Sequence, residues 1–148
     1  MSSEIRLVVD ASVALKWVLH DEEAVDEAAA LRDDAVEREL EMVSPSLWIY
    51  EIANGLVGGI RRKRISRRLG DQALQELLAV WVRLVDPDPA TVVELSIEHG
   101  LSSYDAAYVA LADVLDSPLW TGDRKLHRAL AGALDFVHWI GDYRAVTS

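Results

Sequence analysis

Hydrophobic residues in this chain form short apolar runs separated by longer segments with helical periodicity. The first run, residues 5–9, ends abruptly at Asp10, where a helical pattern begins at once. Such a run is typical of a buried parallel strand. Further strands are predicted at residues 42–44, 83–86, 119–121 and 135–140. Helices are predicted at residues 11–18, 21–40, 46–60, 66–81, 91–99, 102–115 and 124–130.

Strands that alternate with helices predict βαβ units and therefore a parallel sheet. Connections between such strands are right-handed, which restricts the possible topologies. The length of 148 residues suits one hydrophobic core, and the chain contains no repeat, low-complexity tract or linker. The sequence thus predicts a single α/β domain over residues 1–148.

Several residues suggest how individual helices begin and which side they bury. Asp21, Glu22 and Glu23 are expected in the first turn of the second helix, where negative charge suits the helix dipole. That helix has only a thin, alanine-rich apolar stripe, and we place it on the surface. Ser46 is expected to cap the next helix, and Tyr104 to lie on the buried face of helix 102–115.

The amino-acid composition restricts the cellular compartment and the kinds of functional site that we expect. Apolar residues make up 51% of the chain, so a packed interior is possible, and there is no cysteine to form a disulfide or a thiolate metal site. The first apolar run is not a secretory signal, and no apolar stretch is long enough to span a membrane. We therefore expect a cytoplasmic protein. A glycine-rich phosphate loop and a nucleophile elbow are also absent from the sequence.

The charge of the chain is unevenly distributed. The net charge of −10 argues against binding nucleic acid through overall charge. Residues 61–68, however, contain six basic side chains, so this segment is either a local RNA-binding patch or an ordinary solvated loop and helix start. The candidate RNA-binding residues are Arg61, Arg62, Lys63, Arg64, Arg67 and Arg68.

Four acids are expected at one edge of the predicted sheet. In a parallel α/β sheet, the carboxyl ends of the strands and the N-termini of the following helices share an edge. Asp10 and Asp123 each follow a strand, whereas Glu51 and Asp105 each lie early in a helix. Each acid taken alone could be a helix cap or a surface residue. Their common placement by topology favours a shared site.

Such a cluster needs a counter-charge. Two carboxylates about 4 Å apart repel by roughly 4 kcal/mol at an effective dielectric constant of about 20. Either some of them bind protons or a cation lies among them. Ligands that are all oxygens favour Mg²⁺ or Mn²⁺, which promote displacement at phosphorus. Ser12 and Thr121, each near an acid, are expected to hydrogen-bond to metal-binding carboxylates.

At these residues the sequence resembles the PIN-domain ribonucleases, specifically the VapC toxins of toxin–antitoxin pairs. The resemblance rests on four segments that together span almost the whole chain. They are residues 9–13, Pro45 with Glu51 and Asn54, residues 103–112, and residues 121–123 with Leu126. The segments 104–112 and Thr121–Asp123 are the most specific. All four acidic positions match the family pattern.

The resemblance implies a five-stranded parallel sheet and Mg²⁺- or Mn²⁺-dependent cleavage of RNA. It implies catalytic roles for Asp10, Glu51, Asp105 and Asp123, and we assign Asp10, Asp105 and Asp123 to the metal. It also implies homodimers and a cognate VapB-type antitoxin. We expect the antitoxin to dock on the helices 21–40, 46–60 and 66–81, in a groove lined by Trp48, Leu56 and Trp81. The alternative is an inactive PIN-like module that binds a metal or a partner without turnover.

Overall fold

Five short parallel strands form the centre of this computed structural model, which describes residues 5–145. The strands lie in the order β3-β2-β1-β4-β5. Their bounds are β1 Arg6–Val9, β2 Glu41–Ser44, β3 Arg83–Leu84, β4 Leu119–Thr121 and β5 Val137–Trp139. The predicted α/β class and the five-stranded parallel sheet are confirmed.

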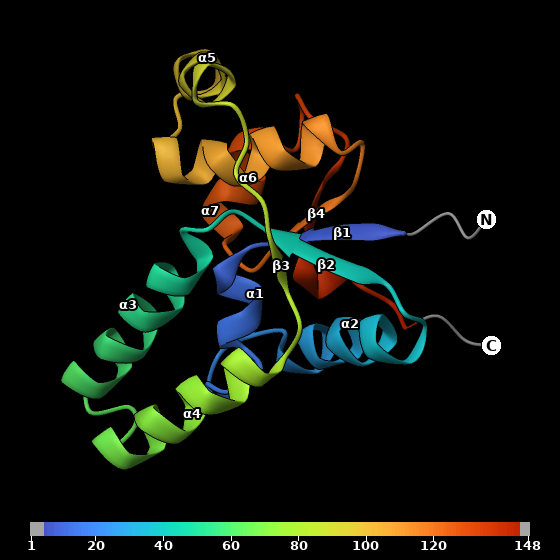
Figure 1. The fold of residues 1–148 in the computed structure, drawn as a ribbon. Coiled ribbons are helices and arrows are strands. Elements are labelled where there is room, and N and C mark those ends of the chain that lie inside the picture. Colours follow the sequence, from blue (N-terminus) through green and yellow to red (C-terminus); the bar gives the residue numbers. More distant parts are fainter. Residues whose placement is uncertain (1–4, 146–148) are drawn as a thin grey trace.

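The strand order changes direction at β1. From β1 the chain moves outward to β2 and β3, then returns to the other side of β1 with β4 and β5. Right-handed crossovers therefore place the helices before β3 on one face and those after it on the other. Figure 1 shows α1, α2 and α4 on one side of the sheet and α5 and α6 on the other. The carboxyl ends of β1 and β4 thus form the switch point where α/β sheets place ligands.

Seven α-helices and one 3₁₀-helix cover this sheet in the described part of the chain. Their bounds are α1 Ala11–Leu15, α2 Val25–Glu37, α3 Trp48–Arg61, α4 Arg67–Ala79, α5 Pro89–His99, α6 Ser103–Val114, α7 Arg124–Leu130 and η1 Ile140–Asp142. Figure 1 shows α3 and α4 as a hairpin that extends away from the strands. None of the helices within residues 5–145 has the length and hydrophobicity needed to cross a bilayer.

The core lies between the central strands and the inner faces of the helices. Val8, Val9 and Leu119 of the sheet are fully buried, as are Tyr108 of α6 and Leu31 of α2. The prediction that the second helix lies on the surface is therefore wrong. Its apolar stripe is thin, yet Leu31 and the small alanines beside it pack closely into the core cluster.

The beginning of α2 also differs from the prediction. The helix begins at Val25, and the three acids lie in the turn before it. Tertiary ion pairs determine their position, because the carboxylates of Asp21 and Glu23 each accept two hydrogen bonds, from Arg64 and Arg124 respectively. Ala24, with a φ of 59°, separates this turn from the helix.

Two further local predictions are wrong. Ser46 does not cap α3, because its backbone N–H donates to Asp86 Oδ1 at 2.8 Å and its hydroxyl donates to the same carboxylate. The helix begins two residues later, with Leu47 as its N-cap residue. Tyr104 is 65% exposed, because it lies in the first turn of α6, at the edge of the sheet rather than over it.

Candidate active site

Asp10 connects the central strand to the first helix. It follows β1 directly and is the N-cap residue of α1, accepting a hydrogen bond from the Ser12 backbone N–H at 3.4 Å. The Thr121 hydroxyl at the end of β4 donates to Asp10 Oδ2 at 2.8 Å. Only 7% of Asp10 is exposed. The two interpretations of this residue therefore coexist, because it caps a helix and also lies at the switch point between β1 and β4.

Residues 121–123 form a turn that is held against the start of α1. The Gly122 N–H donates to Ser12 Oγ at 2.8 Å, and the Asp123 N–H donates to Thr121 Oγ1 at 3.0 Å. Any Cβ at position 122 would lie 2.9 Å from the Ser12 carbonyl oxygen and 2.6 Å from Lys16 Cε. This position therefore needs glycine, so that the backbones after β1 and β4 can approach each other.

Glu51 reaches the same edge from α3. This helix follows β2, which neighbours β1 on the side away from β4. The buried Tyr108 hydroxyl of α6 donates to Glu51 Oε1 at 2.6 Å, which fixes the position of one carboxylate oxygen. Partial burial raises the pKa of Glu51, and the negative charge of Asp105 adds to this effect, whereas the Tyr108 hydrogen bond lowers it. Glu51 and Asp105 are thus close enough to interact electrostatically.

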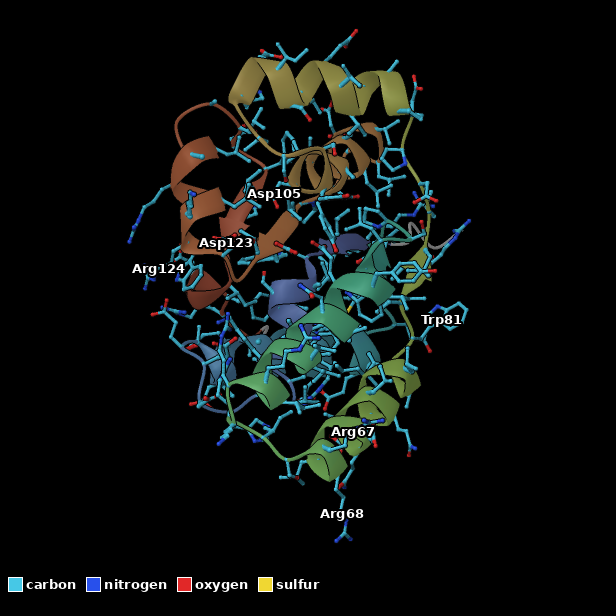
Figure 2. All side chains as sticks on the ribbon, turned by 90° about the vertical axis from the view of Figure 1, so that its left-hand side faces the viewer. Arg67, Arg68, Trp81, Asp105, Asp123 and Arg124 are labelled. Carbon is cyan, nitrogen blue, oxygen red and sulfur yellow. The ribbon has the colours of Figure 1, made fainter. Side chains whose placement is uncertain are left out.

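Asp105 and Asp123 complete the group. Asp105 lies in the first turn of α6, and Asp123 is the N-cap residue of α7, accepting hydrogen bonds from the backbone N–H groups of Lys125 and Leu126. Partial burial raises the pKa of Asp105, and so does the charge of Asp123. Figure 2 shows Asp105 and Asp123 on the same side of the molecule. We refer to Asp10, Glu51, Asp105 and Asp123 as the acidic site.

Electrostatics within the acidic site are strongest at its buried end. Burial raises the pKa of Asp10 to about 7, and the charge of Glu51 contributes, although hydrogen bonds from Thr121 and Ser12 oppose the rise. Asp10 interacts with Glu51, Glu51 with Asp105, and Asp105 with Asp123. The four acids thus form a continuous chain of like charges, which a bound cation would stabilise.

The donor set fits a hard divalent cation, but it does not form a closed cage. Every candidate donor is a carboxylate oxygen, the ligand type that Mg²⁺ and Mn²⁺ prefer. Within residues 5–145, no three acidic or histidine side chains lie close enough to enclose one ion. Mg²⁺ is bound by proteins through one or two carboxylates, with several waters retained. An open arrangement of this kind matches that mode of binding.

The basic segment 61–68 lies away from the acidic site. Arg61 is ten residues beyond Glu51 in the same helix, which corresponds to a rise of about 15 Å. Figure 2 shows Arg67 and Arg68 in the lower part of the molecule and Asp105 and Asp123 in its upper half. Arg64 is paired with Asp21 and Glu22, and Arg67 with Asp71. The structure therefore does not bring this segment to the acids.

Sequence reasoning missed two contributors to this edge. The Tyr108 hydroxyl is bonded to Glu51, although its place in the apolar run of α6 marked it only as a core residue. Asp86, from the segment after β3, binds the backbone and hydroxyl of Ser46 just before α3 and so anchors the helix that carries Glu51. Helical spacing alone gives no signal for either contact, because both partners are distant in the sequence.

An α/β domain with carboxylates at the switch point of a five-stranded parallel sheet defines the class of this protein. The family model for the PIN domain matches residues 7–131. The chain belongs to the PIN domain family.

Named relatives agree with this family. The VapC ribonuclease Mb0985 of Mycobacterium bovis is 40% identical over 126 residues, covering 81% of this chain and 87% of the relative. The Exonuclease VapC9 of Pyrobaculum aerophilum is 31% identical over 117 residues, covering 79% and 88%. The crystal structure of PAE2754 from the same organism superposes with a TM-score of 0.65 at 28% identity, covering 89% of this chain and 91% of that one.

Proposed function

We propose that this protein is an Mg²⁺- or Mn²⁺-dependent endoribonuclease and the toxin of a toxin–antitoxin pair. The observation that carries the proposal is the convergence of Asp10, Glu51, Asp105 and Asp123 at the switch point of the sheet. Relatives named VapC ribonucleases support the same reaction class. Because the chain has no cysteine and its substrate would be cellular RNA, we expect it to act in the cytoplasm.

Each acid has a role in the proposed reaction. Asp10, Asp105 and Asp123 would hold the metal, partly through water molecules that it retains. When bound, the metal lowers the pKa of a water molecule and stabilises charge at phosphorus. Thr121 and Ser12 orient the Asp10 carboxylate through their hydrogen bonds. Glu51 Oε1 is occupied by the Tyr108 hydroxyl, so Glu51 Oε2 is the oxygen that would accept a proton from the attacking water.

The test uses purified protein with a circular single-stranded RNA and with a linear 5′-labelled RNA. Cleavage of both substrates in Mg²⁺ or Mn²⁺, and of neither in EDTA, would support an endonuclease. Cleavage of the linear RNA alone would assign exonuclease activity, as the name of one relative indicates. Metal binding without cleavage of either RNA would instead support the alternative, a PIN-like module that does not catalyse turnover.

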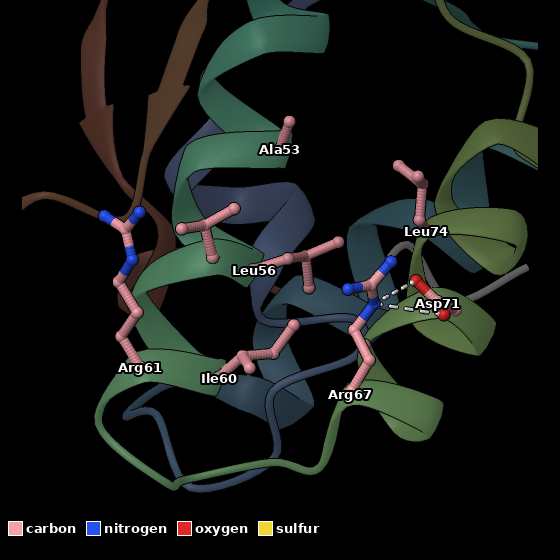
Figure 3. Close-up of a pocket in the computed structure, with 9 residues that line it drawn as sticks. Ala53, Leu56, Ile60, Arg61, Arg67, Asp71 and Leu74 are labelled. Atoms are coloured by element: carbon pink, nitrogen blue, oxygen red, sulfur yellow. Dashed lines mark hydrogen bonds and ion pairs between the residues drawn. The ribbon is translucent and has the colours of Figure 1, made fainter.

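An antitoxin has a docking surface of suitable shape between α3 and α4. Figure 3 shows an apolar groove with arginines on either side. The volume of the groove is about 370 Å³. Its lining residues are Ala53, Leu56, Val57, Ile60, Arg61, Arg67, Gly70, Asp71 and Leu74. Leu56 lines it as expected, whereas Trp48 is buried in the core and Trp81 lines a separate hollow beside α2. An amphipathic antitoxin helix would place its apolar face in this groove.

The antitoxin proposal is tested by expression with and without the neighbouring small open reading frame. We expect growth arrest by the protein alone, rescue by the partner, and co-purification that Ala53→Arg disrupts. Val36→Arg is the matched control, because Val36 is 68% exposed on α2 and does not line the groove. Harmless expression of the active enzyme alone would contradict the toxin role and leave the nuclease role intact. Light scattering then tests the homodimer that we also propose.

A further inference from the structure

The short helix α7 carries three cations with different surroundings. Arg124 donates to the Glu23 carboxylate and lies over the Trp139 ring, 4.4 Å from its centroid. Arg128, one turn further on, also interacts with Glu23. Residues four apart share a helix face, so both arginines point to the acidic turn before α2. The cation between them, Lys125, lies about 100° around the helix from Arg124.

Lys125 faces the acidic site instead. Its backbone N–H donates to Asp123 Oδ1 at 2.9 Å, which fixes its Cα beside that carboxylate. Its ammonium is close enough to Asp105 to interact electrostatically, and its side chain is exposed. In the part of the chain that the structure describes, this ammonium makes no hydrogen bond or ion pair, unlike the guanidinium of Arg124. It is therefore available to a ligand at the acidic site.

The other cations near this edge are already engaged. Lys16 is buried and donates to the Glu23 carbonyl oxygen at 2.7 Å. Arg124, next to Asp123, is held by Glu23 in the turn before α2. An RNA strand that approaches four carboxylates is repelled by them, so the site needs a cation that can contact phosphate directly. Within residues 5–145, Lys125 therefore lies near the acids and has an ammonium that is not engaged in an ion pair.

We propose that the Lys125 ammonium binds a phosphate of single-stranded RNA at the acidic site, beside the phosphate that is cleaved. This inference rests on the proposed function, since it specifies how the same site holds its substrate. An ammonium contacts phosphate as a point charge, so Lys125 contributes affinity and position and does not read the base sequence.

The proposal predicts opposite effects of Lys125→Gln on two ligands. Removing this charge weakens RNA binding, because a phosphate contact is lost. The same change strengthens binding of Mn²⁺ alone, because the ammonium no longer repels a cation held by Asp105 and its neighbours. A variant that is merely misfolded would weaken both, so the two signs together separate a binding role from a structural one.

The experiment measures binding of a fluorescent 12-nucleotide RNA in Mg²⁺ by anisotropy, as a function of salt. All variants are made in an Asp10→Asn background, so that the RNA stays intact. Lys125→Gln should weaken binding about tenfold and lower the salt slope by about 1, while Lys125→Arg should retain both. Arg128→Gln removes the same charge from the same helix and should have a much smaller effect.

Metal binding is measured separately, with Mn²⁺ alone and Asp10 intact. Lys125→Gln should bind Mn²⁺ about threefold more tightly at low ionic strength. Equal RNA affinity of Lys125→Gln and Arg128→Gln, or weaker Mn²⁺ binding by Lys125→Gln, would overturn the inference even if the enzyme cleaves RNA. Absence of RNA cleavage by the wild type would overturn the proposed function, while a Lys125-dependent loss of RNA binding would still support the phosphate contact.

Discussion

Asp10 and Asp123 lie at opposite ends of one site and in opposite environments. Asp10 is buried at the end of the central strand, where burial raises its pKa to about 7. Asp123 is exposed at the start of α7, and its carboxylate accepts two backbone hydrogen bonds. Negative charge on Asp10 is therefore unfavourable, and a bound cation would stabilise it, whereas Asp123 is open to solvent. Acids at one sheet edge thus differ in their electrostatics according to their burial.

The largest expected effect comes from neutralising the buried end. Asp10→Asn should lower the rate of RNA cleavage by at least about 10³-fold, because the metal ligand that we propose is replaced by a neutral amide of the same shape. Asp113→Asn is the matched control, since Asp113 lies on α6, two turns beyond Asp105. The measurement is the initial rate in Mn²⁺ with folding checked by circular dichroism. Wild-type cleavage by folded Asp10→Asn would remove this residue from the mechanism.

The pH dependence of stability should also reveal the buried charge of Asp10. Because the pKa of Asp10 is about 7 in the folded protein and 3.8 is its ordinary value, the folded state binds more protons between these pH values. The free energy of unfolding in EDTA should therefore fall as the pH rises from about 4 to above 7. Raised pKa values of Glu51 and Asp105 act in the same direction.

The contribution of Asp10 to this fall is roughly 4 kcal/mol at most. Asp10→Asn should flatten the profile and be more stable than the wild type at pH 8. Urea unfolding at several pH values measures both proteins. If the free energy of unfolding depends on pH in the same way for the wild type and Asp10→Asn, ionisation of Asp10 does not cause the loss of stability.

Tyr108→Phe tests the hydrogen bond that positions Glu51. The change removes a donor 2.6 Å from a half-buried carboxylate, so we expect a loss of about 1 kcal/mol in stability. Because that hydrogen bond lowers the pKa of Glu51, its loss raises this pKa, and cleavage should fall more at pH 6 than at pH 8.

Tyr143→Phe is a matched control for this prediction. Its hydroxyl also donates to a carboxylate at 2.6 Å, that of Asp34, in a different part of the fold. It should lower stability and leave the pH profile of cleavage unchanged. Identical pH profiles for the two variants would show that Tyr108 serves the fold only.

The smallest effect is expected for the basic segment. Replacing Arg61, Arg62, Lys63 and Arg68 with Gln removes four charges from the basic segment, which follows the far end of α3 from Glu51. RNA binding should weaken by less than the loss caused by Lys125→Gln, with a shallower salt slope and unchanged metal affinity. Arg64 and Arg67 are left intact because they form ion pairs. Unchanged RNA affinity would assign the segment to a protein partner or to solvation.

Topology allowed the acidic site to be predicted from the sequence, whereas side-chain contacts did not follow from it. The acid after β1 and the acid after β4 share an edge in any parallel sheet of this order, so Asp10 and Asp123 could be placed together. The strands and most helix ends followed from apolar periodicity and from stop signals such as Gly100, which has a φ of 66°.

The two failed predictions about helix starts share one physical cause. Asp21 and Glu23 suit a helix start by local rules, but Arg64 and Arg124 from distant segments bind them in a turn. Ser46 would cap α3 by the same local rules, but it is hydrogen-bonded instead to the carboxylate of Asp86, in the segment after β3. In each case an interaction between residues far apart in the sequence outweighs a helix-end preference worth about 1 kcal/mol.

We propose that carboxylates from separate elements bind one and the same cation. Calorimetric titration of Mn²⁺ into the wild type, Asp10→Asn, Asp105→Asn and the double variant measures this sharing. Each single change should weaken Mn²⁺ binding at least about tenfold, and the double variant should lose much less binding free energy than the sum of the two losses. Wild-type Mn²⁺ affinity in either single variant, or strictly additive losses, would contradict a shared metal site.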